Sequence, residues 1–146
     1  MPQGQRADPY KNFKFLVEIE GIAVAGFSEC DGLTTEVNVI EYREGNEDIT
    51  VRKLPGLVKY SNITLKRGIT GSKDLYNWYK EVVKGKIKQI RRNMAIVLLD
   101  DEGNQAVRWV VRNAWPMKYT GPTLNAKSSE VAIETLEIAH EGFELE

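Results

Sequence analysis

The amino-acid sequence predicts a single, mainly β domain that carries one α-helix. Several short segments alternate between apolar and polar residues, the period of a strand with one buried face. A separate segment repeats its apolar residues at helical spacing. The chain has 146 residues, of which 42% are hydrophobic, enough for one core with little room for a second. We therefore treat residues 1–146 as one domain, with the polar residues 1–8 as an N-terminal lead that we expect to be flexible.

The first strands are expected near the N-terminus. Apolar residues occupy every second position from Phe13 to Ile19. Gly21 interrupts this alternation and residues 22–27 resume it, which predicts a hairpin over about 13–27. The turn pair Asp31-Gly32 follows, and a further strand is expected over 33–42.

Residues 43–56 break the pattern and are predicted to form a long protruding loop. The segment contains a charged run at 44–48, a short apolar-polar piece at 49–51, and Leu54-Pro55-Gly56. Loops of this length in a compact domain are usually functional or disordered. Alternation returns over 59–67, which predicts another half-buried strand.

The helix is predicted over about residues 72–84. Ser72 is a favourable N-cap, Asp74 falls in the first turn, and Gly85 suits the position after a helix end. The apolar residues of this segment form one stripe that we expect to pack in the core: Leu75, Trp78, Tyr79, Val82 and Val83.

The C-terminal half predicts a hairpin and one ambiguous segment. Strands over 94–99 and 106–111 flank residues 100–104, a turn with three carboxylates that we interpret as solvated, since calcium loops spread their ligands over about twelve residues. In residues 131–138 the apolar positions change phase, so a strand with a bulge and an amphipathic helix both fit.

Charge and hydropathy exclude several classes of partner. Lys and Arg number 20 against 21 Asp and Glu, so no net field would by itself recruit nucleic acid or an anionic membrane. The longest apolar runs, such as 95–99, are far too short to span a bilayer. We expect cytoplasmic synthesis and no membrane insertion.

The sequence also lacks the residue patterns of catalysis and of cofactor or metal binding. Cys30 and His140 are the single cysteine and the single histidine, which leaves no usual combination of metal ligands and no nucleophile with a paired base. Residues 67–73 lack the spacing of a phosphate-binding loop. We predict that the protein is not an enzyme, that it has no cofactor, and that both Cys30 and His140 are structural.

One basic cluster stands out, formed by Lys84, Lys86, Lys88, Arg91 and Arg92. A phosphate-binding patch would have this composition. No aromatic residue lies among these charges to stack on a base. A solvated face or a charged contact between subunits is the favoured interpretation.

Several segments together resemble a known family. They are residues 15–21, 25–29, 51–68, 75–78, 91–93, 112–116, 124–127 and 130–134. In this order and spacing the chain resembles the tail tube proteins of contractile phages, especially the inner tube subunits of extracellular contractile injection particles. The resemblance covers roughly residues 8–146.

The resemblance implies a fold of two packed antiparallel sheets closing as a barrel-like sandwich with one helix at its side. Residues 131–138 would then be a strand. It further implies homohexameric rings that stack into a hollow conduit for protein cargo or DNA. Sheath, baseplate and terminator proteins of the same particle would be partners, and the particle would be a phage tail or a phage tail-like assembly that is released from the cell.

The long loop is our candidate for the contact between stacked rings, because it mixes opposite charges with apolar anchors. Individual exposed ion pairs contribute little, so the apolar anchors should dominate. The candidate contact residues are Glu44, Glu47, Asp48, Ile49, Val51, Arg52, Lys53 and Leu54.

Two alternatives remain from the sequence. A ring or carrier protein of type VI secretion would share the fold class, although Leu54-Pro55-Gly56-Leu57-Val58 favours the phage-like branch. A small β-barrel that binds a ligand such as a flavin is a second alternative. No feature of the sequence asks for a flavin.

Overall fold

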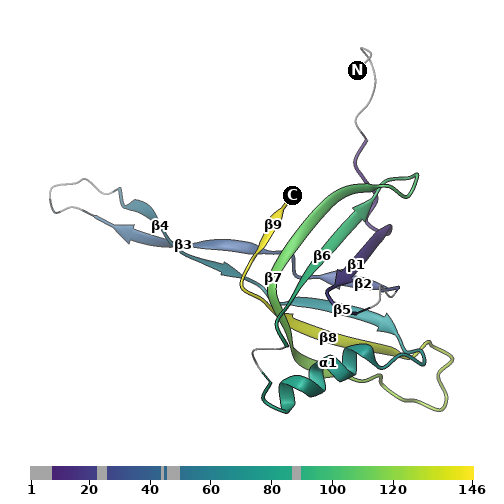
Figure 1. The fold of residues 1–146 in the computed structure, drawn as a ribbon. Helices are drawn as coiled ribbons and strands as arrows, with labels where there is room; N and C mark the ends of the chain where they lie inside the picture. Colours follow the sequence, from purple (N-terminus) through teal and green to yellow (C-terminus); the bar gives the residue numbers. More distant parts are fainter. Residues whose placement is uncertain (1–7, 23–25, 44, 46–49, 87–89) are drawn as a thin grey trace.

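The computed structural model describes residues 8–22, 26–43, 45, 50–86 and 90–146 (Figure 1). In these residues the chain is mainly β with one helix, as predicted. The elements are β1 (Phe15–Ile19), β2 (Glu29–Asp31), β3 (Thr35–Tyr42), β4 (Arg52–Tyr60), β5 (Ile63–Gly68), α1 (Asp74–Val83), β6 (Arg92–Leu99), β7 (Gln105–Thr120), β8 (Ile133–Ala139) and β9 (Phe143–Leu145). Residues 133–139 are thus a strand, which confirms that choice.

Most strands form one bent, antiparallel sheet in the order β1-β6-β7-β8-β5-β2, with β9 also beside β7. The long strand β7 joins two layers, because residues 105–114 pair with β6 whereas residues 115–120 pair with β8. Asn113, at the change of partner, has a φ of 51°. The predicted sandwich is confirmed. It does not close as a barrel, because β1 and β2, at the two ends of the strand order, do not pair with each other in the described chain.

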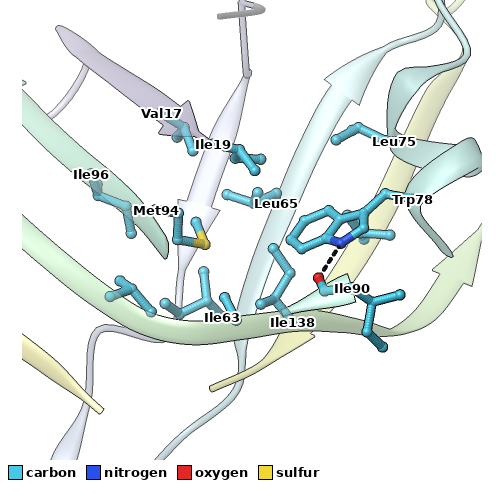
Figure 2. Packing of buried hydrophobic residues seen from close by; sticks show 13 residues of the cluster. Val17, Ile19, Ile63, Leu65, Leu75, Trp78, Ile90, Met94, Ile96 and Ile138 are labelled. Atoms are coloured by element: carbon cyan, nitrogen blue, oxygen red, sulfur yellow. Dashed lines mark hydrogen bonds between the residues drawn. The ribbon is translucent and has the colours of Figure 1, made fainter. Parts of the chain in front are cut away.

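The core lies between the two layers and is closed at one end by α1. Side chains from β1 and β6 face those from β5 and β8, and Leu75 and Trp78 of the helix complete the cluster (Figure 2). The indole Nε1–H of Trp78 donates a hydrogen bond of 2.7 Å to the carbonyl of Ile90, which satisfies the polar atom of this buried ring.

The helix begins two residues later than predicted. Its N-cap is Lys73, without a side-chain cap, so the assignment of Ser72 as the N-cap is wrong. Ser72 instead makes a side-chain hydrogen bond to Asp74, whose carboxylate also accepts the Leu75 N–H at 2.8 Å. Gly85 follows the helix with a φ of 81°, as expected.

Two strand predictions were wrong. β1 pairs with β6. Of the predicted hairpin over 13–27, the described residues show only an isolated bridge between Ile19 and Ile22, and residues 23–25 lie outside them. Periodicity shows which face of a strand is buried but does not name its partner. The predicted strand 59–67 is divided between the end of β4 and β5. In addition, β7 is longer than the predicted strand 106–111 and continues through Trp115-Pro116.

Strands β3 and β4 form a separate two-stranded ribbon that projects from the sandwich (Figure 1), and we call them the arm. Residues 52–56 were predicted to belong to the long loop, but they are the first part of β4. Proline and glycine suggested a loop there. In the described chain β4 pairs on one side only, with β3, and proline is tolerated in such edge strands.

Candidate interaction surface

The arm exposes most of its apolar side chains. Leu57 is 77% exposed and Leu54, opposite Ile40 in the strand register, is 47% exposed. The large exposed apolar residues on and beside the arm are Val37, Val39, Ile40, Tyr42, Val51, Leu54, Leu57 and Val58. Val37 lies opposite Val58, and Ile40 lies opposite Leu54, so exposed apolar side chains adjoin across the two strands. Exposed apolar patches mark interaction sites.

Opposite charges pair across the two strands of the arm. Glu41 lies opposite Lys53, and Glu36 lies opposite Lys59. Such cross-strand pairs favour the ribbon's register. Oppositely charged residues thus lie opposite each other within the arm, whereas Leu54, Leu57 and Val58 are exposed.

The structure places half of the predicted contact residues at one end of the arm. Val51 precedes β4, and Arg52, Lys53 and Leu54 open it. The other predicted residues, Glu44, Glu47, Asp48 and Ile49, lie outside the described residues. Sequence reasoning missed the apolar residues of β3, because residues 33–42 were predicted only as a further strand and not as part of an interaction surface. No signal in the single sequence separates an arm from a core strand.

The arm is joined to the sandwich at a close-packed root, which consists of residues 32–34 and 61–62. Gly32 has a φ of 103°, and a Cβ at this position would lie 2.1 Å from the backbone oxygen of Asn62. The N–H of Ser61 donates to the carbonyl of Thr34 at 3.0 Å. These contacts join the chain segments that enter and leave the arm.

A second open surface lies where the sandwich fails to close. A hollow of about 710 Å³ has its walls formed from β1, β2, β6 and β7 and their flanking residues. Its apolar lining includes Phe13, Phe15, Phe27, Leu33, Leu98 and Trp109. The outer edges of β1 and β2 have no strand partner in the described residues, so they offer free backbone groups.

A buried ionic network fastens the helix to the sheet. Arg67 of β5 is 3% exposed. Its guanidinium lies 2.8 Å from Glu134 of β8 and 2.7 Å from Asp74 of α1. The hydroxyl of Tyr119 donates to the other oxygen of Glu134 at 2.8 Å. One cation therefore connects three elements.

This network changes the acidity of two of its members. Burial alone would raise the pKa of Asp74, but the hydrogen bond and the positive charge of Arg67 outweigh it and hold this pKa below its ordinary value. Burial, followed by the hydrogen bond to Glu134, raises the pKa of Tyr119 to about 12. Both groups are thus fixed in one charge state near neutral pH, as a structural network requires.

Cys30 has the environment of a packing residue. It lies on β2, partly buried against the core. Burial, and then the neighbouring carboxylates of Asp31 and Glu29, raise the pKa of its thiol to about 12. The reactive thiolate is therefore scarce at neutral pH.

Part of the basic cluster is engaged within the chain. Arg92 lies over the ring of Trp78 at 5.3 Å and donates to the carbonyl of Glu20 at 3.2 Å. Arg91 pairs with Glu141 at 3.5 Å. Lys88 lies outside the described residues.

In the parts of the chain that are described, no helix is both long and apolar enough to cross a membrane.

Comparison with known proteins gives one family match. The profile of the T4-like virus tail tube protein gp19 family matches residues 11–144. No curated protein sequence matches the chain.

Chains from contractile particles are among the solved structures with a similar fold. A chain of the sheath–tube complex of PVC, an extracellular contractile injection system, has 27% identity and a TM-score of 0.82, covering 94% of this chain and 91% of that one. A chain of the terminating cap of the anti-feeding prophage has 26% identity and a TM-score of 0.83, with coverage of 99% and 95%. Hcp1 from Flavobacterium johnsoniae, at 14% identity and a TM-score of 0.57, covers 91% of this chain and 94% of its own and shares the fold only.

The family match spans nearly the whole chain, and the structural relatives above 25% identity agree with it in fold and coverage. The resemblance found in the sequence is therefore confirmed. The chain belongs to the T4-like virus tail tube protein gp19 family and is a tail tube subunit.

Proposed function

We propose that this subunit forms homohexameric rings that stack into the inner tube of a contractile phage tail or injection particle. The tube would serve as a conduit for protein cargo or DNA. The observation that carries the proposal is the arm, a two-stranded ribbon with exposed apolar side chains. Isolated two-stranded ribbons are marginally stable in water. A neighbouring copy would give this ribbon a surface to pack against.

Ring formation would use the open side of the sandwich. The outer edges of β1 and β2 flank an apolar hollow, and an added strand from a second copy would satisfy backbone groups and cover aromatic side chains at once. A rotation that closes after six copies leaves no such edge exposed. The wall would then be a continuous sheet.

Stacking would use the arm, including the residues just before and at the start of β4. A head-to-tail contact that does not close on itself extends without limit, which a tube requires. Leu54 and Val51 would supply the apolar anchors, with Arg52 and Lys53 beside them. The proposal also keeps Glu44, Glu47, Asp48 and Ile49 of the predicted loop, which lie outside the described residues.

The proposed partners are the sheath, baseplate and terminator proteins of the same particle. Support comes from related chains, which occur in a PVC sheath–tube complex and in a PVC sheath/tube terminator at 27% and 26% identity. A chain of the same fold occurs in the anti-feeding prophage baseplate. The subunit would be made in the cytoplasm and then enter the particle. Its role would be structural rather than enzymatic, as for the tube proteins of its family.

The test is assembly of the purified protein. Size-exclusion chromatography and negative-stain electron microscopy over a concentration series should show six-fold rings and hollow tubes. If the subunit stays monomeric at every concentration, and still does so with the baseplate proteins of its own particle, the proposal is overturned.

A matched pair of variants tests the arm. Leu54→Asp should fold normally but block tube formation, because a carboxylate would be buried in the contact. Val83→Asp is the control, since Val83 is 68% exposed but lies on α1. Normal tubes from Leu54→Asp would remove this residue from the stacking contact.

A further inference from the structure

We infer that His140 is a positioning residue that fixes the direction of the arm and makes tube assembly sensitive to pH. The inference rests on the proposed role of the arm in assembly. His140 lies in the turn between β8 and β9, beside the root from which the arm leaves the sandwich. It is the single histidine of the chain.

The hydrogen bonds of the ring define its tautomer. The backbone N–H of Gly142 donates to Nδ1 at 3.1 Å, so Nδ1 carries no proton. Nε2 lies 2.8 Å from the carbonyl oxygen of Ser61, which can only accept. His140 is therefore neutral, with its proton on Nε2. The ring links the β8–β9 turn to the first residue after β4.

Packing reinforces this link. The ring of Tyr60, the last residue of β4, contacts the rings of His140 and Phe143 edge-on, with centroid distances of 5.8 and 5.3 Å. Gly142 allows the turn to approach, because a Cβ there would lie 2.6 Å from the Arg112 guanidinium and 3.1 Å from the Tyr60 ring. Ser61 also donates its N–H to Thr34 at 3.0 Å. Both chain segments of the arm root are thus connected to the imidazole.

Protonation would break this arrangement at one atom. A proton on Nδ1 removes the lone pair that accepts from Gly142 and sets two N–H groups against each other. Imidazole is the side chain whose charge ordinarily changes between about pH 5 and pH 8. Protonation of this ring would therefore loosen the β8–β9 turn from the arm root.

The charged groups on the surrounding elements are already paired. Arg112 of β7 lies 3.2 Å from Glu144 of β9. Glu141, next to His140, pairs with Arg91 at 3.5 Å and accepts a hydrogen bond from Asn113. Glu137 of β8 accepts from Asn62 at 3.2 Å. On β4, Lys59 lies opposite Glu36 of β3, and the phenol of Tyr60 belongs to the ring cluster. Protonation of His140 itself would remove the Nδ1 acceptor and leave these other contacts in place.

The experiment compares wild type with His140→Phe and Phe143→Leu at about pH 7.5 and about pH 5.5. These two values lie on either side of the middle of the pH interval in which imidazole side chains ordinarily change charge. His140→Phe keeps a ring against Tyr60 but removes both hydrogen bonds. Phe143→Leu disturbs the ring packing but keeps both bonds. Hydrogen–deuterium exchange of the arm amides in the unassembled subunit, corrected for the intrinsic effect of pH, is measured together with tube yield. Circular dichroism checks that each variant is folded.

In wild type, arm exchange should rise about fivefold at the lower pH, the factor that one net hydrogen bond is worth, and tube yield should fall. His140→Phe should exchange fast and assemble poorly at both pH values, with no difference between them. Phe143→Leu should keep the wild-type pH profile. The inference is overturned if His140→Phe matches wild type in exchange and pH profile, or if wild type shows no change with pH. Failure of wild type to form tubes under any condition would instead overturn the proposed function.

Discussion

At the scale of single residues, Arg67 is the most deeply buried charged residue in the described chain, with an exposed fraction of 3%. We expect Arg67→Met to lower the free energy of unfolding by about 3–5 kcal/mol, because Glu134 and Asp74 would keep their charges without a cation. Chemical denaturation followed by tryptophan fluorescence measures the change. The same substitution at the neighbouring Lys66, whose exposed pair with Glu29 spans 3.2 Å, should cost no more than about 1 kcal/mol. Equal losses in both variants would contradict a structural role for the buried network.

The sequence could not have predicted this network. Asp74 was correctly expected in the first turn of the helix, and Arg67 was expected at the end of the predicted strand 59–67. Their meeting with Glu134 depends on the register of β5 and β8, which sets Arg67 directly opposite Glu134. Arg67 and Glu134 are 67 residues apart in the chain. Register between such distant strands is a property of the assembled sheet and leaves no local pattern.

At the scale of elements, Gly32 controls how the arm joins the sandwich. Gly32→Ala combines a φ of 103° with a Cβ 2.1 Å from the Asn62 oxygen, so the root has to move. We expect a loss of about 1–3 kcal/mol in the free energy of unfolding, the usual range for a strained backbone position. Gly71→Ala is the control, because a Cβ there meets nothing within 4 Å. A Gly32→Ala variant as stable as Gly71→Ala would show that the root is not tightly packed.

Periodicity was sufficient for most elements but not for their pairing. The helix and the hairpin of β6 and β7 were found because each has its own apolar pattern and its own turn residues. β8 was ambiguous from its periodicity, and the family resemblance decided it as a strand. The partner of β1 and the bend of β7 were missed, because they are decided by which apolar faces meet across the core. The arm was half missed for a related reason. Proline and glycine in β4 predicted a loop, and only the antiparallel pairing with β3 makes the strand.

At the scale of the whole molecule, the sandwich and the arm have different requirements for stability. The sandwich has a closed cluster of buried side chains. Among the described strands, β3 and β4 pair only with each other, and their apolar residues are exposed. Folding of the sandwich should therefore not depend on the arm, whereas assembly should.

Replacement of the arm separates the two requirements. Thr35 and Tyr60 are opposite each other in the register, so residues 36–59 can be replaced by an Asn-Gly turn that joins these two positions as a tight hairpin. Tyr60, Ser61 and His140 would keep their contacts in the shortened chain. We expect the free energy of unfolding to stay within about 1 kcal/mol of wild type, as for other changes outside the core. The shortened subunit should stop at single rings and form no tubes at concentrations where wild type forms tubes, as measured by analytical ultracentrifugation and electron microscopy. A shortened chain that still forms tubes would show that stacking does not need the arm. One that fails to fold would show that the arm stabilises the sandwich from which it projects.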